Sequence, residues 1–191
     1  MRKLKLQMQT TVDGCVAGPE GQLDWMTFDM DPGLLAFINH LTDTSDTILL
    51  GRKMTDGFIK YWEHVVTQKD SPEHAFAQKM VGLPKVVFSK TLPHIEGKNV
   101  RVENGDLVDA VKQLKSRPGK DIIVYGGATF VSSLIEHGLI DEYHLGINPV
   151  ILGRGTPLFK GGPNRIPLKH LETRTLKSGV VILHYAPESR Q

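Results

Sequence analysis

The chain has 191 residues, of which 40% are hydrophobic and 23% are charged. This length corresponds to one domain, with enough hydrophobic side chains for a core that needs no disulfide or metal. The formal net charge of +2 is too small to favour a nucleic-acid partner, and no hydrophobic run approaches the roughly 20 residues that cross a bilayer. The N-terminal segment also lacks the uninterrupted hydrophobic stretch of a signal peptide. We therefore expect a cytoplasmic protein with no nucleic-acid or membrane partner.

Strand-like and helix-like segments alternate through the first two thirds of the chain. Alternating hydrophobic residues, or short hydrophobic runs, predict strands over 4–8, 47–50, 85–88 and 121–125. Hydrophobic residues at helical spacing predict helices over 34–41, 108–114 and 130–135. This order is typical of a parallel sheet whose strands are connected by helices.

The last third of the chain changes character. Strand-like segments separated by stretches rich in glycine and proline cover residues 142–150, 168–175 and 180–185. Lys177, Ser178 and Gly179, between the last two segments, are typical of the turn of a hairpin. The whole pattern predicts an α/β fold in which helices flank a mixed sheet with an antiparallel finish.

Three of the predicted strands end in residues suited to binding an anion. Glycines let the backbone approach a ligand closely, the first N–H groups of a helix can face a phosphate, and cations attract it. The residues at the three junctions are Gly51-Arg52-Lys53, Ser89-Lys90 and Gly126-Gly127.

Each junction alone also has a simpler interpretation, as a structural turn or a solvated loop. Neither the dinucleotide fingerprint G-x-G-x-x-G nor the P-loop pattern is present. Parallel strands, however, bring their carboxyl ends to one edge of the sheet, where open α/β sheets bind ligands. The three junctions together therefore predict a cleft for a polyphosphate ligand.

The segment Asp24–Asp31 combines aromatic side chains with three carboxylates close to a predicted helix start. Asp29 and Asp31 have two interpretations, a role in a site and the capping of the helix by a carboxylate oxygen. If Trp25 and Phe28 form a hydrophobic wall beside Asp31, its pKa should be raised. The carboxyl group could then donate a proton near neutral pH.

The sequence contains no local pattern for a metal site or a reactive cysteine. The eight histidines include no His-x-His or His-x-x-x-His pair, so we expect no metal site. The single cysteine, Cys15, excludes an intramolecular disulfide. With no histidine close to it in the sequence, Cys15 is expected to be a buried, unreactive thiol.

A series of short motifs runs along the chain in a fixed order. They are Thr11-Val12-Asp13-Gly14, Val16-Ala17-Gly18, Asp24-Trp25, Leu50-Gly51-Arg52-Lys53, Val87-Phe88-Ser89 and Tyr125-Gly126-Gly127-Ala128, followed by the stretches 138–143 and 148–159. In this order they resemble dihydrofolate reductase-like proteins. The closest branch is related to the C-terminal reductase domain of the bifunctional riboflavin-biosynthesis deaminase/reductase. The resemblance covers nearly the whole chain, so residues 1–191 are expected to form a single domain of this type.

The resemblance implies a dihydrofolate reductase-like three-layer fold, with a mixed central sheet of about eight strands, an antiparallel C-terminal strand and flanking helices. It also implies an NADPH molecule that lies across the strand ends. Val16 and Ala17 would flank the nicotinamide, and Ser89 and Lys90 would line the adenosine end. Gly51, Arg52 and Lys53 would hold the pyrophosphate and the adenosine 2′-phosphate. Gly126, Gly127, Ala128 and Thr129 would cradle the pyrophosphate, and Tyr125 before them is a further cofactor-binding candidate.

One position departs from the family pattern. The family often has threonine after Gly-Arg-Lys, whereas this chain has Met54 there and Thr55 one place later. A hydroxyl that would cap the helix and touch phosphate is therefore displaced by one residue.

The resemblance implies an NADPH-dependent reductase of a small polar substrate, such as a pterin, a pyrimidine or a related heterocycle. Asp31 and Asp29 are the candidate proton donors, and Trp25 and Phe28 are candidate substrate contacts. A second hypothesis is a stand-alone 5-amino-6-(5-phosphoribosylamino)uracil reductase, in which Arg154 and Lys160 are the candidates to bind the substrate phosphate. A third is a nucleotide-binding module without catalytic activity, motivated by the altered helix start. Because related proteins commonly pair, we also expect a homodimer.

Overall fold

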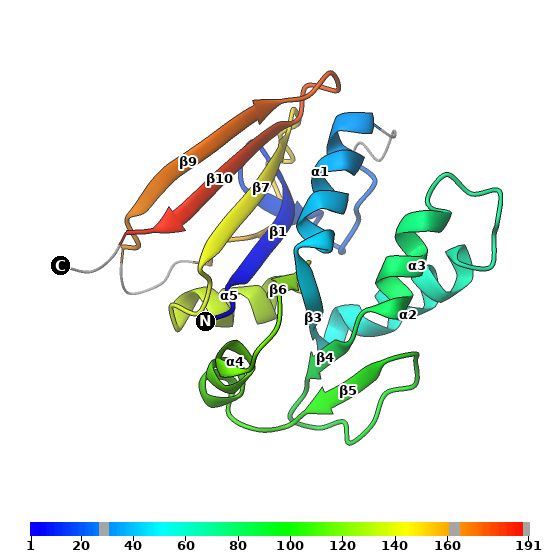
Figure 1. Ribbon diagram of the computed structural model, residues 1–191. Helices are drawn as coiled ribbons and strands as arrows, with labels where there is room; N and C mark the ends of the chain where they lie inside the picture. Colours follow the sequence, from blue (N-terminus) through cyan, green and yellow to red (C-terminus); the bar gives the residue numbers. More distant parts are fainter. Residues whose placement is uncertain (27–30, 161–164, 189–191) are drawn as a thin grey trace.

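A central sheet organises the computed structural model, which describes residues 1–26, 31–160 and 165–188. The sheet has eight strands in the order β5-β4-β3-β6-β1-β7-β10-β9, and a second sheet pairs β2 with β8 (Figure 1). The strands are β1 (Leu4–Thr11), β2 (Cys15–Ala17), β3 (Ser45–Gly51), β4 (Lys85–Phe88), β5 (Val100–Glu103), β6 (Asp121–Val124), β7 (Glu142–Asn148), β8 (Thr156–Pro157), β9 (Leu168–Thr175) and β10 (Val181–Pro187). The helices are α1 (Pro32–Asp43), α2 (Arg52–Val65), α3 (His74–Gly82), α4 (Leu107–Ser116) and α5 (Ala128–Glu136).

The strand directions fix where a ligand site can form. All neighbouring pairs from β5 to β7 are parallel, whereas β10 is antiparallel to both β7 and β9. The predicted mixed sheet and its antiparallel C-terminal strand are therefore confirmed. Because β1, β3, β4 and β6 run in one direction, their carboxyl ends lie along the same edge of the sheet.

Helices cover both faces of the sheet. Figure 1 shows α1, α2 and α3 on one face and α4 and α5 on the other. Because successive side chains of a strand point to opposite faces of the sheet, they pack in two hydrophobic clusters, one on each face. Leu49 of β3 packs in the cluster under α4 and α5, whereas its neighbours Ile48 and Leu50 pack in the cluster under α1 and α3. No helix in the described ranges is long and hydrophobic enough to cross a membrane.

The predicted strands and helices are confirmed, but several elements were not predicted from the sequence. These are β2, β5, β8, α2 and α3. At the β3 junction the simpler interpretation as a solvated loop is wrong, because α2 begins immediately after Gly51. The buried residues Thr55 and Ile59 have helical spacing, but Gly57 and the many polar residues of α2 obscure the pattern.

Lys85 ties the end of α3 to the start of β4, beside the strand that carries the first junction. Its residue is only 3% exposed, and its Nζ donates hydrogen bonds to the carbonyl oxygens of Met80 (2.7 Å), Leu83 (2.7 Å) and Val81 (3.1 Å). Burial lowers the pKa of Lys85 to about 8. The last carbonyl groups of a helix have no donor within the helix, and here the ammonium group of Lys85 supplies that donor.

We expect Lys85→Met to lower the free energy of unfolding by about 2–3 kcal/mol, because buried carbonyl groups would lose their donor. Denaturant unfolding followed by circular dichroism measures the change. Lys112→Met, at an exposed position of α4, is the matched control and should change stability by less than about 0.5 kcal/mol. Equal effects of the two substitutions would show that Lys85 does not have this role.

Candidate active site at the carboxyl ends of the parallel strands

The ends of β3, β4 and β6 meet in the structure, in agreement with the sequence prediction. Gly51 pairs with Phe88 in the parallel register of β3 and β4. A Cβ atom at Gly127 would lie 3.6 Å from the Cα atom of Gly51, so the two backbones are close together. The rings of Phe88 and Phe130 stack with their centroids 5.1 Å apart. These residues form one continuous surface beneath the three junctions.

Two helices begin at this edge without a side-chain cap. The N-cap residue of α2 is Gly51 and that of α5 is Gly127, and neither helix start receives a side-chain hydrogen bond. Gly127 has a φ of +87°, a conformation that favours glycine. Since the first N–H groups of a helix have no partner within the helix, both starts can donate to an anion. Their close approach allows one diphosphate to span them.

Exposed cations stand beside the two helix starts. Arg52 and Lys53 are exposed, and neither forms an ion pair with any residue that the structure describes. Asp56, one turn further along α2, pairs instead with Lys60 at 2.8 Å. Lys90 is also exposed and donates to the carbonyl oxygen of Gly105 at 2.9 Å. The cations of the first junction are therefore available to an anionic ligand.

A cavity of about 210 Å³ opens beside the second junction, Ser89-Lys90. Ser89, at its margin, is buried, and its Oγ accepts hydrogen bonds from the N–H groups of Leu92 (3.0 Å) and Thr91 (3.3 Å), which shapes the turn after β4. The cavity thus combines aromatic, hydroxyl and cationic groups. Its lining residues are Phe88, Ser89, Lys90, Glu103, Gly105, Leu107, Phe130 and Ser133.

The displaced hydroxyl of the α2 start is not available to a ligand. Thr55 is buried, and its Oγ1 donates to the carbonyl oxygen of Gly51 at 3.0 Å. Met54 lies against the turn after β6, because a Cβ atom at Gly126 would be 3.0 Å from its Sδ. Anion binding at this helix start therefore depends on backbone N–H groups and cations.

The loop after β1 contains Val16 and Ala17, the residues predicted to flank the nicotinamide. Val16 is only 5% exposed and belongs to the core, whereas Ala17 is half-buried. Ala17 pairs with Thr156 of β8, so the exposed Arg154, two residues earlier, lies close to the same loop. Cys15 is a buried free cysteine, as predicted.

Asp31 caps α1, and the predicted elevation of its pKa is wrong. Its Oδ2 accepts a hydrogen bond from the N–H of Ser178 (2.9 Å), and its Oδ1 accepts one from the N–H of Gly33 (2.8 Å). These two bonds stabilise the carboxylate and hold the pKa of Asp31 below its ordinary value. Trp25 is half-buried and donates from Nε1 to the carbonyl oxygen of Gln22 at 3.2 Å. Phe28 and Asp29 lie outside the described residues.

Tyr125 faces the helices rather than the edge of the sheet. Its hydroxyl lies 2.7 Å from the Oγ1 of Thr42 in α1, and its ring stacks on Phe58 of α2 with a centroid distance of 6.1 Å. Burial raises the pKa of Tyr125 well above its ordinary value. Tyr125 therefore anchors α1 and α2 to the strand end that leads into Gly126.

A buried amide pair near the same edge was not predicted. Asn148, at the end of β7, donates from Nδ2 to the Oε1 of Gln9 at 2.9 Å and to the carbonyl oxygens of Thr10 and Gly146, both at 3.2 Å. The Nε2 of Gln9 is buried and has no hydrogen-bond partner among the described residues. The sequence signal was the alternation of glutamines in a strand that proves to be buried along almost its whole length.

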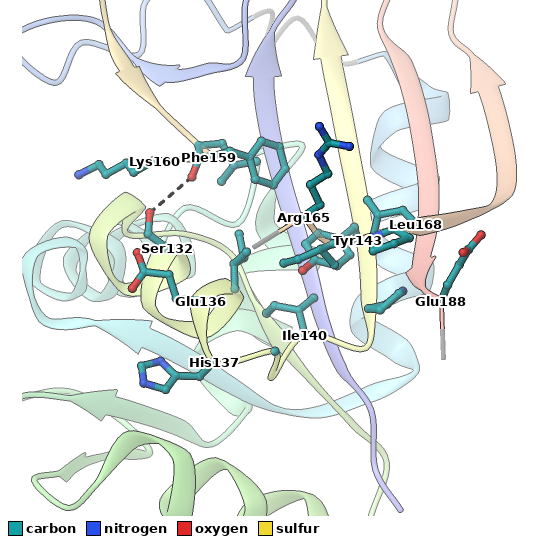
Figure 2. A pocket seen from close by; sticks show the side chains of 16 residues that line it. Ser132, Glu136, His137, Ile140, Tyr143, Phe159, Lys160, Arg165, Leu168 and Glu188 are labelled. Carbon is teal, nitrogen blue, oxygen red and sulfur yellow. Dashed lines mark hydrogen bonds between the residues drawn. The ribbon is translucent and has the colours of Figure 1, made fainter. Parts of the chain in front are cut away.

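A larger cavity of about 770 Å³ lies elsewhere, beside α5 and β7 (Figure 2). Ser132 donates a weak hydrogen bond of 3.4 Å to the carbonyl oxygen of Leu158 at its margin. The cavity shares no residue with the predicted site, and its lining contains many hydrophobic side chains. Those labelled in Figure 2 include Ile140, Tyr143, Phe159 and Leu168. We therefore place the candidate site at the strand ends, where free N–H groups and cations converge.

Comparisons with known proteins identify the family of the chain. The family model described as the RibD C-terminal domain matches residues 2–182. The chain is 38% identical to the uncharacterized protein YyaP of Bacillus subtilis over 186 residues, which cover 96% of this chain and 94% of YyaP.

Solved structures share the fold. A putative riboflavin biosynthesis protein from Shewanella sp. PV-4 superposes with a TM-score of 0.74 at 23% identity, covering 99% of this chain and 100% of that protein. A diaminohydroxyphosphoribosylaminopyrimidine deaminase/5-amino-6-(5-phosphoribosylamino)uracil reductase from Thermotoga maritima gives 0.67 at 16% identity, covering 97% of this chain and 56% of that protein. Dihydrofolate reductase from Enterococcus faecalis, complexed with NADP(H), gives 0.64 at 15% identity, covering 98% and 97%. These similarities confirm the predicted dihydrofolate reductase-like fold.

Gly51, the N-cap of α2, and Gly57, within α2, allow a matched test of the close approach of β3 and α5. Gly51→Ala should lower the free energy of unfolding by about 1–3 kcal/mol, because the new Cβ atom would lie 2.5 Å from the Cβ of Phe130 and would push α5 away. Gly57→Ala meets nothing within 4 Å and should stabilise α2 by about 0.5–1 kcal/mol. Thermal and denaturant unfolding measure both variants. A harmless Gly51→Ala would contradict the close approach of β3 and α5.

Proposed function

The chain belongs to the RibD C-terminal domain family, and from this premise we propose that it is an NADPH-dependent reductase of a small heterocycle of the pyrimidine class. Membership of this family and the dihydrofolate reductase-like fold indicate a reductase. The observation that carries the choice of cofactor is the convergence of two uncapped helix starts, at Gly51 and Gly127, with exposed cations beside them.

The described residues fit a dinucleotide with a 2′-phosphate. The N–H groups at the starts of α2 and α5 would bind the pyrophosphate. Arg52 and Lys53 would bind the 2′-phosphate, because a guanidinium fork matches phosphate oxygens in a bidentate manner. The adenosine would lie at the cavity beside Ser89 and Lys90, against the stacked Phe88 and Phe130.

NADPH supplies a hydride when it is bound, and the protein must orient the substrate and exclude water. The Nε2 of Gln9 is a hydrogen-bond donor whose direction is fixed, because Asn148 holds the Oε1 of the same amide. This donor is buried, so it would pair with a ring carbonyl oxygen of a pyrimidine only after substrate binding exposes it. Ala17 and Trp25 would enclose the substrate on the side of the loop after β1.

A 5-amino-6-(5-phosphoribosylamino)uracil reductase is the second candidate. The specific observation in its favour is the position of Arg154, which is exposed and lies next to the strand pair of Ala17 and Thr156. A substrate phosphate would need a cation at such a place, outside the dinucleotide site.

Steady NADPH oxidation in the presence of a candidate substrate tests the proposal. Pyrimidines with and without a ribose phosphate, together with dihydrofolate and simple pteridines, form the panel. We expect turnover with an oxo-pyrimidine, and dependence on the ribose phosphate would favour the second candidate. NADPH binding without turnover across the panel would favour a nucleotide-binding module, and absence of NADPH binding would contradict the proposal.

Arg52 should discriminate between NADPH and NADH. Arg52→Ala should weaken NADPH binding by about ten- to a hundredfold, the value of one charge-assisted hydrogen bond, and leave NADH binding almost unchanged. Lys90→Ala should also weaken NADPH binding more than NADH binding. Isothermal titration with both cofactors measures the difference, with Lys60→Ala as a control because Lys60 pairs with Asp56 further along α2. Equal losses for both cofactors would contradict the assignment of Arg52 to the 2′-phosphate.

Asp31→Asn separates capping from proton donation. The lowered pKa of Asp31 means that its ionised form stabilises the folded chain above a pH of about 4, and that this contribution disappears as the pH falls through the folded-state pKa. At neutral pH the melting temperature of the variant should therefore be a few degrees lower than that of the wild type. In strong acid the two melting temperatures should be equal. Turnover of an identified substrate should be retained. A loss of turnover that deepens as the pH rises would instead make Asp31 the proton donor.

A further inference from the structure

Three side chains that can bind a metal ion converge on the face of the sheet covered by α1. They are Glu142 and His144 of β7 and His184 of β10, and their potential ligand atoms all lie within 4.8 Å of one another. His144 and His184 are direct partners in the antiparallel register, and their rings stack with a centroid distance of 4.0 Å. Phe37 of α1 packs against His144, with ring centroids 5.8 Å apart. The cluster is therefore set by strand register and helix packing.

The distances within the cluster match those of a shared cation. The Oε2 of Glu142 lies 3.2 Å from the Nε2 of His144 and 3.5 Å from the Nε2 of His184. Ligand atoms placed about 2.0–2.1 Å from a tetrahedral Zn²⁺ ion lie about 3.3 Å from one another. The Nε2 of His184 is buried and has no hydrogen-bond partner among the described residues. One carboxylate oxygen and two imidazole nitrogens thus lie close enough together to share an ion.

The cluster is separate from the candidate active site. The candidate active site lies at the carboxyl ends of the strands, where β7 ends at Asn148. His144 precedes Asn148 by four residues, roughly 13 Å along an extended strand, and Glu142 begins the strand at the opposite edge. The sequence did not predict this cluster because β7 and β10 are distant in the chain and become neighbours only in the sheet.

We propose that Glu142, His144 and His184 form a binding site for a divalent transition-metal ion of the Zn²⁺ type. Two imidazoles and one carboxylate suit such an ion, whereas Mg²⁺ and Ca²⁺ prefer oxygen ligands alone. Three protein ligands leave a fourth position to water. The bound ion would cross-link β7 to β10 and so stabilise the C-terminal part of the sheet.

Neighbouring groups orient the carboxylate. Lys3 donates from Nζ to the Oε1 of Glu142 at 2.6 Å, which directs the other oxygen, Oε2, toward the two histidines. A hydrogen bond of this kind outside the ligand set fixes the direction of a ligand atom. Glu172 of β9 lies opposite His184 in the register, and its carboxylate is paired with Arg174 at 2.6 Å. His184 has a side-chain exposure of 20%, which leaves a path for an ion from solvent.

Calorimetric titration of the tag-free, chelator-treated protein with Zn²⁺, Co²⁺ and Mg²⁺ tests this proposal. The wild type should bind one Zn²⁺ per chain, Co²⁺ should give the visible absorption of a tetrahedral complex, and Mg²⁺ should not bind. A free Zn²⁺ concentration a hundred times the Kd should raise the melting temperature by roughly 5–10 °C.

Variants identify the ligands. Each of His184→Ala and Glu142→Gln should weaken Zn²⁺ binding by more than about a hundredfold, beyond the effect of losing a neighbouring orienting group. His170→Ala, on the same hairpin but bonded to the Oγ1 of Thr173, is the matched control and should bind as the wild type does. Circular dichroism shows whether each variant is folded, and Glu142→Gln keeps the shape of the site. No binding by the wild type, or unchanged binding by both ligand variants, would overturn the proposal.

Discussion

The contact between two glycine backbones, Gly51 and Gly127, is the constraint on which the candidate site depends. A Cβ atom at Gly127 would lie only 3.6 Å from the Cα of Gly51, and one at Gly51 would overlap Phe130. Because both residues lack side chains, the starts of α2 and α5 come together at the edge of the sheet. Their N–H groups are then available to a single anion, because the partial positive charges of the two helix starts add to each other.

The charges around this contact determine what the edge can bind. Arg52 and Lys53 have no ion-pair partner among the described residues, whereas Asp56 is neutralised by Lys60. The chain lacks a side-chain cap at α2, since Thr55 bonds back to Gly51 and Met54 fills the turn beside Gly126. The site therefore depends on backbone donors and cations, which suits a dinucleotide with an additional phosphate better than a neutral ligand.

The sequence predicted the strands and the three junctions because hydrophobic runs that end in glycine or cations are local signals. It also predicted their convergence, since parallel strands end on one edge. It could not predict the pKa of Asp31, because the N–H of Ser178 that lowers this pKa comes from a hairpin 147 residues away. The orientation of Gln9 and the cluster around His144 likewise arise from the pairing of distant strands. Interactions of this kind depend on register, which no local pattern contains.

We propose that α2 and α5 together bind the pyrophosphate of NADPH. Backbone amide NMR of the wild-type chain during an NADPH titration tests it most directly. We expect the largest shifts to fall on the N–H groups of residues 51–54 and 127–130, at the two helix starts. Shifts concentrated around the larger cavity, at Tyr143 and Leu168, would contradict it.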